Sequence, residues 1–534
     1  MPLLLAKNKL HRKNRLKQKS SSPLKPSLSR TSKNQKDIQK TFTSTFSCTS
    51  SSKKLYQPKP LLQKSTHTQS STTTLGSSFL KIPNFTKPPL KTRIFSRFTK
   101  TSELFLYKNL KSHSNTSSSS TCIDNSIILP KAKRKEEIGK FKFLIYNGNN
   151  SELIKNLLDL RSSWSEGYFT MPSSVNFIWM PTSQNIKFEK LKALNNTQYV
   201  NHLEFHHEIS NKSKLFANLT LFCANNKISI WDVVPMTFII DFRSCNFNSQ
   251  LHCFKLYMTN AYSKKWPPTH YVGRNVWIMK PAGLNRGRGI MVFDDIDTLE
   301  KEVKEITSNK TPGHATTYVI QKYIEKPLLI YNRKFDIRVW VLITQLENCY
   351  FFPQGYLRTS SESFTLDSLS SKFVHLTNNA VQKDGKEYGK FESGNQISFK
   401  QFKKYLKTYF GNIQLSNIIS IMKTQIIISL MAVKGKLNPH NRPNCFEIFG
   451  YDFIIDSLFK PWLIEVNTNP CIELSSPLLE QIIPRMLDDA LELTIDTVFP
   501  TEKTQLKTSM VLNLPQGNMW EFLVCLKEPG ELLV

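Results

Sequence analysis

A cluster of glycine and arginine residues is the strongest constraint on the fold of this 534-residue chain. Glycine is scarce overall, with 18 residues, about half of its usual frequency. Three of them, Gly283, Gly287 and Gly289, nevertheless fall within seven residues, beside Arg286 and Arg288. Glycine lets backbone N–H groups approach an anion closely, and neighbouring cations neutralise its charge. The cluster therefore predicts a phosphate-covering loop, with a basic surface hairpin as the alternative.

Strand-forming residues flank this loop on both sides. Residues 277–279 precede it, residues 290–293 follow it, and Lys280 adds another cation at its start. This pattern predicts two strands joined by the loop. A P-loop would need Gly-Lys-Ser/Thr at the start of a helix, and a dinucleotide-binding fold would also place its glycines there. Neither pattern is present, so we interpret the segment as a nucleotide loop of another kind.

Positive charge is concentrated in the first quarter of the chain. The formal net charge is +31, and residues 1–135 contain 28 Lys and Arg against Asp37, Glu103 and Asp124. This region is rich in Ser and Thr and has few periodic apolar positions, so we predict a disordered basic arm. Such an arm favours a polyanionic partner: nucleic acid, an anionic membrane or an acidic protein tail. A solvated tail without a partner and an organelle transit peptide are the alternatives.

The remaining composition indicates a large folded region in a reducing compartment. No apolar run is long enough for a signal-peptide core or a membrane span. The nine cysteines form no Cys-x-x-Cys pair, so neither a zinc site nor a disulfide framework is predicted. We divide the chain into a basic arm (1–135), an N-terminal lobe (140–270), central and C-terminal lobes (271–500) and a C-terminal tail (501–534).

Strand and helix patterns alternate irregularly through the folded region. Strands are predicted at residues 141–146, 229–241, 317–324, 335–346, 446–455 and 461–466. Helices are predicted from Ser151 onward, with Ser151 as the N-cap, within 397–434 and at 477–497. The mixture predicts an α+β fold with antiparallel strand pairs and flanking helices rather than strict βαβ alternation.

Two acidic residues and an asparagine lie on or next to the last two predicted strands. Glu465 and Asn467 are two positions apart and so share one face of a strand, and a hairpin would place Asp452 opposite them. Carboxylate and amide oxygens suit Mg2+ held jointly with a triphosphate. The flanking residues are apolar, so the acids would be costly to bury without a cation. Acids that face solvent at a strand end are the alternative.

Charged residues also alternate with apolar ones at 334–338. On a strand, Lys334, Asp336 and Arg338 share one face, which indicates either a site for phosphate and metal or a salt-bridged solvent face. Arg358 adds a cation suited to a carboxylate. Residues 321–324 follow an apolar strand and are a candidate hinge whose backbone reads an adenine edge.

The order of these segments is more specific than any one of them. Six motifs follow one another along the chain: 277–281, 286–290, 321–324, 334–338, 375–379 and 461–467. This order resembles the tubulin tyrosine ligase-like family of ATP-grasp amino-acid ligases. The resemblance covers roughly residues 141–500 and leaves out the basic arm and the C-terminal tail. It implies an ATP-grasp-like catalytic region, with ATP and Mg2+ as cofactors.

The resemblance implies roles for individual residues. Those implied to bind ATP are Lys280, Arg286, Gly287, Gln321, Lys322, Tyr323, Ile324, Lys334, Asp336, Thr377 and Asn378. Those implied to hold Mg2+ are Asp452, Glu465 and Asn467. Those implied to contact substrate are Arg286, Arg338 and Arg358, and the implied catalytic cations are Arg286, Lys334 and Arg358. Arg358 would bind the α-carboxylate of the incoming amino acid, and a structural role is expected for His375.

The family adds tyrosine, glutamate or glycine to its acceptors through an acyl phosphate. Glutamylases often carry Gly-Lys-Trp after the His-Leu-Thr-Asn motif, whereas residues 393–397 here read Ser-Gly-Asn-Gln-Ile, without a lysine. Glycine has no side-chain carboxylate to neutralise, so glycine ligation to glutamate side chains of tubulin tails is favoured. A tubulin polyglutamylase and a catalytically silent microtubule-binding protein are the alternatives.

The resemblance also implies partners and a location. The expected partners are tubulin or microtubules, through their acidic tails, and a free amino acid, glycine or glutamate. No nucleic acid is expected, because the folded part lacks interleaved aromatic or recognition-helix signals. The expected location is the cytoplasm and cytoskeleton, including the axoneme of a cilium or flagellum.

Overall fold

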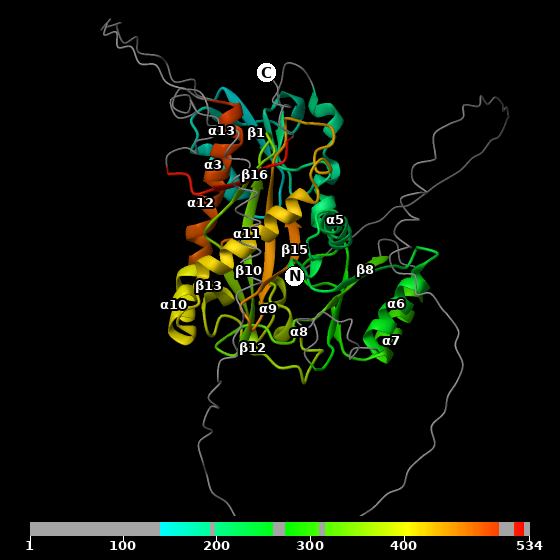
Figure 1. Ribbon diagram of the computed structural model, residues 1–534. Helices are drawn as coiled ribbons and strands as arrows, with labels where there is room; N and C mark the ends of the chain where they lie inside the picture. The colour runs from blue at the N-terminus through cyan, green and yellow to red at the C-terminus, as the bar shows by residue number, and fades with distance from the viewer. Residues whose placement is uncertain (1–138, 193–197, 260–272, 309–314, 501–516, 528–534) are drawn as a thin grey trace, which may run out of the picture. The chain divides into compact units, whose positions relative to one another are not determined.

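The computed structural model describes residues 139–192, 198–259, 273–308, 315–500 and 517–527, all of which belong to one compact unit, Leu90–Val534. The predicted basic arm lies outside the described residues. The described part combines helices with a four-stranded parallel sheet, a four-stranded antiparallel sheet and an eight-stranded antiparallel sheet (Figure 1). The predicted α+β class is therefore confirmed.

The parallel sheet is built from the first four strands. It has the order β2-β1-β3-β4, from β1 (Phe141–Ile145), β2 (Trp164–Glu166), β3 (Phe177–Trp179) and β4 (Tyr199–Val200). Parallel strands require long crossovers, and α3 (Ser151–Asp159) provides the first one. The sequence pattern favoured antiparallel pairs, so this sheet differs from the prediction. Its strands of two to five residues are too short to show a clear period.

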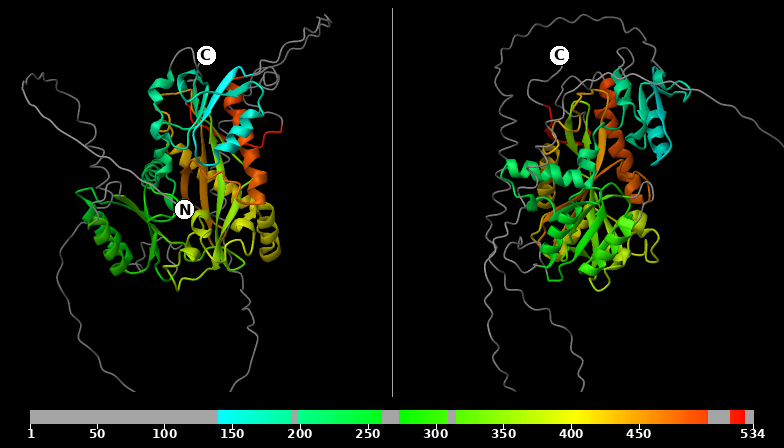
Figure 2. Two further views of the ribbon diagram at one scale, coloured as in Figure 1. Left: turned by 180° about the vertical axis from the view of Figure 1, so that it is seen from behind. Right: turned by 90° about the vertical axis from the view of Figure 1, so that its right-hand side faces the viewer.

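The antiparallel four-stranded sheet carries the glycine-rich loop. Its order is β5-β8-β6-β7, from β5 (Thr237–Asp241), β8 (Thr317–Lys322), β6 (Trp277–Pro281) and β7 (Met291–Phe293). Helices α6 (Phe247–Thr259) and α7 (Ile296–Ser308) lie side by side and pack their apolar residues on one face of it (Figures 1 and 2). The sheet includes strands from both sides of the predicted boundary at residue 270, and the domain division stays a prediction.

The eight-stranded sheet is centred on one long strand. Its members are β9 (Leu329–Ile330), β10 (Arg333–Ile343), β11 (Asn348–Phe351), β12 (Tyr356–Ser363), β13 (Gln396–Ser398), β14 (Glu447–Ile455), β15 (Pro461–Thr468) and β16 (Glu521–Cys525). β16 pairs with β11, so the region predicted as a C-terminal tail contributes a strand to this sheet.

Strand β10 separates two hydrophobic cores. Phe335 and Ile337 join the core formed with α5 (Lys212–Asn225), α10 (Phe399–Phe410) and α11 (Leu415–Met431). Trp340 and Leu342 join the core shared with α3, α12 (Pro477–Leu493) and the parallel sheet. Because side chains alternate along a strand, the charged residues at 334, 336 and 338 lie on the Trp340 side.

The helices confirm most of the predicted helical segments. The short helices are α4 (His207–Ser210), α8 (Lys372–His375), α9 (Asn379–Gln382) and α13 (Ile495–Val498). The 3-10 turns are Pro172–Ser174, Ser183–Asn185, Phe188–Lys192, Ile230–Asp232 and Ser393–Asn395. Within the segment predicted as helical at 397–434, a first helix ends at Gly411, whose φ of 62° falls in the left-handed region that favours glycine. No helix in the described ranges is long and apolar enough to cross a membrane.

Two predicted elements differ from the structure. The strand predicted at 229–241 begins only at Thr237, because a 3-10 turn (Ile230–Asp232) and Pro235 occupy its first half. Ser151 was expected as a helix cap but is the first helical residue of α3, after Asn150 in a left-handed conformation.

Candidate active site

Four charged residues from three neighbouring strands form a buried cluster. In the strand register Asp336 lies opposite Arg358, and Arg338 lies opposite Asp452. Arg338 donates two hydrogen bonds to Asp452, from Nε to Oδ1 at 2.5 Å and from Nη2 to Oδ2 at 3.0 Å. Arg358 donates from Nε to Asp336 Oδ1 at 2.8 Å, and its Nη2 lies 2.8 Å from Asp452 Oδ2. We call these four residues the guanidinium–carboxylate cluster.

The two acids on β14 and β15 face each other as predicted. Asp452 pairs with Glu465 in the register of β14 and β15. Asn467 donates from Nδ2 to Asp452 Oδ2 at 3.1 Å and to Glu465 Oε1 at 3.2 Å. The predicted hairpin therefore brings all three side chains together, beside the guanidinium–carboxylate cluster.

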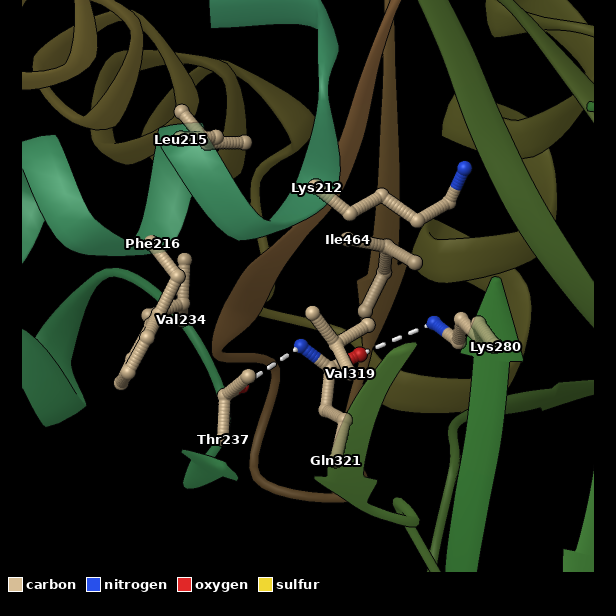
Figure 3. Close-up of a pocket in the computed structure, with 9 residues that line it drawn as sticks. All are labelled: Lys212, Leu215, Phe216, Val234, Thr237, Lys280, Val319, Gln321 and Ile464. Atoms are coloured by element: carbon tan, nitrogen blue, oxygen red, sulfur yellow. Dashed lines mark hydrogen bonds between the residues drawn. The ribbon is translucent and has the colours of Figure 1, made fainter. Parts of the chain in front are cut away.

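Two buried lysines approach the same region. Lys280 on β6 donates to Gln321 Oε1 at 2.9 Å, and Gln321 in turn donates to Thr237, as Figure 3 shows. Lys334 on β10 donates to the Tyr323 hydroxyl at 2.9 Å and to the His375 carbonyl at 2.8 Å. Their direct acceptors are all neutral. We call Lys280 and Lys334 the lysine pair.

Burial without a bonded carboxylate makes this lysine pair unusual. Burial lowers the pKa of Lys280 to about 8, although the charge of Glu465 opposes the shift. Burial, reinforced by the charge of Lys280, lowers the pKa of Lys334 to about 7. An anionic group bound between them would favour both charged forms. The arrangement is therefore suited to holding phosphate.

Lys280 and Gln321 border a pocket between β15 and the antiparallel sheet. The residues that line it are Lys212, Leu215, Phe216, Val234, Thr237, Lys280, Val319, Gln321 and Ile464 (Figure 3). Apolar side chains from α5, β8 and β15 contribute most of its wall. The wall is mostly apolar with a few convergent polar groups, and the space that it encloses holds little more than a water molecule.

The hinge predicted at residues 321–324 is mostly engaged by protein groups. Lys322 donates to Glu325 at 2.5 Å and to the Val276 carbonyl at 2.7 Å. The Tyr323 hydroxyl contacts His375 Nδ1 at 2.8 Å. These side chains stabilise the end of β8, and the assignment of the segment to adenine stays a prediction.

The glycine-rich loop joins two antiparallel strands, as predicted. Arg286 and Gly287 have φ values of 64° and 74°, and both arginines of the loop are exposed. A Cβ on Gly287 would lie 2.9 Å from Val381 and 3.4 Å from Leu376, so the loop packs closely on the segment that contains Thr377. The structure thus brings this loop next to residues 377–378, as the predicted nucleotide site requires.

Residues 189–506 match the family model described as the Tubulin-tyrosine ligase family. This chain belongs to that family. It is 39% identical to tubulin glycylase 3B of Tetrahymena thermophila over 238 residues, which is 44% of this chain and 19% of that protein. It is 37% identical to tubulin glycylase 3A of Drosophila melanogaster over 238 residues, which is 43% of this chain and 23% of that protein. The chain thus spans about a fifth of the length of these curated relatives.

The three residues predicted to hold Mg2+ can be compared with the ligands that this ion requires. Asp452, Glu465 and Asn467 supply hard oxygen ligands at one place, which suits Mg2+ shared with phosphate. Asp452 already accepts from two guanidinium groups, whereas the charge of Glu465 acts more strongly on Lys280 than that of Asp452 does. No group of three or more His, Cys, Asp or Glu in the described part of the chain could hold a metal. These residues fit a cation that takes its other ligands from a nucleotide.

One charged residue of this site was missed from the sequence. Lys212, at the start of α5, places its Nζ 3.1 Å from Glu465 Oε2. Burial would raise the pKa of Glu465, but Lys212 and Lys280 hold it well below its ordinary value. In the sequence Lys212 follows a helix-capping asparagine and precedes an apolar helix, so nothing distinguished it from an ordinary surface lysine.

His375 has the structural role expected for it. Its Nδ1 contacts the Tyr323 hydroxyl at 2.8 Å, and its Nε2 contacts the Ser368 carbonyl at 2.9 Å. Burial and the charge of Lys334 lower the pKa of His375 to about 4, so the ring is neutral near pH 7. With both ring nitrogens engaged, His375 orients Tyr323 and its own carbonyl toward Lys334.

Proposed function

We propose that this chain is an ATP-dependent ligase that joins free glycine to glutamate side chains of tubulin tails. The observation that carries the proposal is the lysine pair beside Asp452, Glu465 and Asn467, because it combines phosphate-binding cations with oxygen ligands for Mg2+. Family membership and relatives that are named tubulin glycylases support the same activity. The ATP-grasp assignment of the fold belongs to this proposal.

The proposed chemistry needs no nucleophile from the protein. An oxygen of the acceptor glutamate attacks the γ-phosphorus of ATP, the bond to the β–γ bridging oxygen breaks, and ADP leaves. The amino nitrogen of glycine then attacks the acyl carbon, inorganic phosphate leaves with the C–O bond electrons, and the nitrogen loses a proton. Lys280 and Lys334 would stabilise charge on the phosphoryl oxygens, and bound Mg2+ would add Lewis-acid stabilisation there.

Arginines are assigned to the two substrates. We assign Arg358 to the α-carboxylate of glycine, as the family resemblance implies. Its guanidinium binds the carboxylates of Asp336 and Asp452, so the α-carboxylate would compete with them for it. Arg338 holds Asp452 in place, and Arg286, exposed in the loop, is assigned to the acceptor chain. The remaining predicted nucleotide residues, Thr377 and Asn378 among them, keep their assignment as part of the proposal.

Neutral groups near Arg358 favour glycine over glutamate. Gln396 lies opposite Arg358 in the register of β12 and β13. Its amide donates to Ser475 at 3.2 Å and accepts from the Ser476 hydroxyl. A side-chain carboxylate placed here would gain no cation from these three residues. Glutamate ligation remains the alternative activity.

The decisive assay measures which amino acid is incorporated. The 534-residue chain with ATP, Mg2+ and tubulin should incorporate labelled glycine and not labelled glutamate. Glutamate incorporation without glycine would identify a polyglutamylase.

The variant Glu465→Gln separates catalysis from binding. It should lose nucleotide binding and amino-acid incorporation while tubulin binding is kept. If the unaltered chain binds tubulin but incorporates neither amino acid, the catalytically silent microtubule-binding protein is the correct reading. The proposed substrate also places the chain on the cytoskeleton, including cilia or flagella.

A further inference from the structure

The first residues of α5 hold the start of the glycine-rich loop. The Lys212 backbone N–H donates to the Ala282 carbonyl at 3.1 Å. The Lys212 ammonium donates to the Leu284 carbonyl at 2.9 Å. Between these two points, a Cβ on Gly283 would lie 3.8 Å from the Asn211 amide. The helix therefore binds the loop through backbone and side chain at once.

The same ammonium also binds the acid expected to hold the cation. Lys212 Nζ lies 3.1 Å from Glu465 Oε2, and the side chains of Lys212 and Glu465 are largely buried. The other oxygen, Oε1, accepts from Asn467 at 3.2 Å. Lys212 and Lys280 reach into the same pocket from α5 and β6 (Figure 3). One ammonium thus connects β15 to the loop.

These contacts make the Glu465 carboxylate a point of competition. A divalent cation that takes Oε2 needs the position from which the Lys212 ammonium binds it, and two cations repel each other strongly at such short range. Displacement from Glu465 would shift the ammonium and so disrupt its hydrogen bond to the Leu284 carbonyl, because the same Nζ makes both contacts. Cation binding would then remove the side-chain half of the attachment that holds the loop.

We propose that Lys212 couples cation binding at Glu465 to release of the loop 282–289. Lys212 is then a positioning residue: it sets how strongly Glu465 attracts a cation and whether the loop is held or free. In the proposed ligase, the coupling would free the loop when the metal-bound nucleotide binds. Only this use of the coupling rests on the proposed function. The coupling itself needs neither amino acid nor acceptor.

The first test measures cation affinity on the full chain, with Mn2+ as the probe and electron paramagnetic resonance as the readout. Lys212→Met should bind Mn2+ about tenfold more tightly than the unaltered chain, because the competing ammonium is gone. Lys212→Arg, which keeps the positive charge, should not. The matched control is Lys214→Met, two residues along the same helix, where the lysine contacts Glu208 at 2.7 Å and not the loop. Equal Mn2+ affinity in Lys212→Met and the unaltered chain would overturn the proposal.

The second test measures the loop itself. Arg286 and Arg288 are exposed, so the rate of tryptic cleavage after them reports loop release. Mn2+ should raise this rate several-fold in the unaltered chain and in Lys214→Met. Lys212→Met should be cleaved fast with or without Mn2+. A rate that does not respond to Mn2+ in the unaltered chain would overturn the coupling, and so would a Mn2+ response that survives in Glu465→Gln.

The two proposals fail separately. Loss of glycine incorporation with intact Mn2+ coupling would refute the ligase assignment and leave the role of Lys212 in place. Glycine incorporation without Mn2+ coupling would support the ligase assignment and refute the role of Lys212. A thermal melt of each variant shows whether it is folded, and Lys212→Gln provides a second neutral side chain if Lys212→Met is not.

Discussion

The guanidinium–carboxylate cluster and the lysine pair lie in the same site, but the buried charges are paired with opposite charges only in the cluster. In the cluster two guanidinium groups bind two carboxylates, so positive and negative charges balance. In the pair, Lys280 and Lys334 donate only to an amide, a hydroxyl and a carbonyl among the contacts described. The cluster holds strands together, whereas the pair retains attraction for an anion.

Because the charges are paired only in the cluster, mutations in the cluster and in the lysine pair should have different consequences. Removing one member of a balanced buried cluster leaves an opposite charge uncompensated, and the cost appears in folding stability. Removing a lysine whose hydrogen-bond acceptors are neutral leaves no opposite charge uncompensated, so the main cost appears in ligand affinity. Variants of the two groups should therefore differ in what they lose.

The largest effect is expected for Arg338→Met in the cluster. The substitution leaves Asp452, only 2% exposed, without its two-bond partner, and Arg358 alone remains to neutralise it. The free energy of unfolding should fall by about 3–5 kcal/mol. Urea unfolding of the full chain measures this change, with the exposed loop residue Arg288→Met as the control. A loss below about 1 kcal/mol would show that the cluster is not structural.

A smaller effect, of a different kind, is expected for Lys334→Met in the lysine pair. Nucleotide affinity should fall about 10- to 100-fold, which matches the loss of one charge-assisted hydrogen bond of about 1.5–3 kcal/mol. The free energy of unfolding should change much less than in Arg338→Met. Equilibrium binding of a non-hydrolysable ATP analogue and urea unfolding measure the two quantities. Unchanged nucleotide affinity together with a large loss of folding stability would show that Lys334 is structural, like the guanidinium–carboxylate cluster, and does not bind phosphate.

Sequence reasoning predicted which charged side chains lie together, because strand periodicity determines the face on which each one lies. The spacing of Glu465 and Asn467, and the alternation at 334–338, determine which side chains share a face whatever the partner strand is. It could not show that Arg358 is already bound by Asp336 and Asp452, because that pairing depends on the register between strands. Lys212 was missed for a related reason, since its partners lie 72 and 253 positions away.

The parallel sheet and β16 are the parts of the fold that the sequence could not predict. Strands of two to five residues contain too few positions to reveal a period or a direction, so the order β2-β1-β3-β4 follows from tertiary packing alone. β16 lies after a long segment outside the described residues, and only its pairing with β11 reveals that it belongs to the large sheet.

The smallest effect expected is a pH dependence that belongs to the lysine pair and not to the cluster. The folded-state pKa values of Lys280 and Lys334, about 8 and about 7, lie below the ordinary lysine value of 10.5. Between these values the unfolded chain binds more protons than the folded one. The contribution of these lysines to stability therefore rises as pH increases from about 7 to 10. Phosphate affinity should fall as the pH rises, because deprotonation removes the positive charge of the lysines. Affinity for the ATP analogue should fall several-fold between pH 6.5 and 9, and by less in Lys334→Met. A profile as steep in that variant as in the unaltered chain would assign the pH dependence to another group.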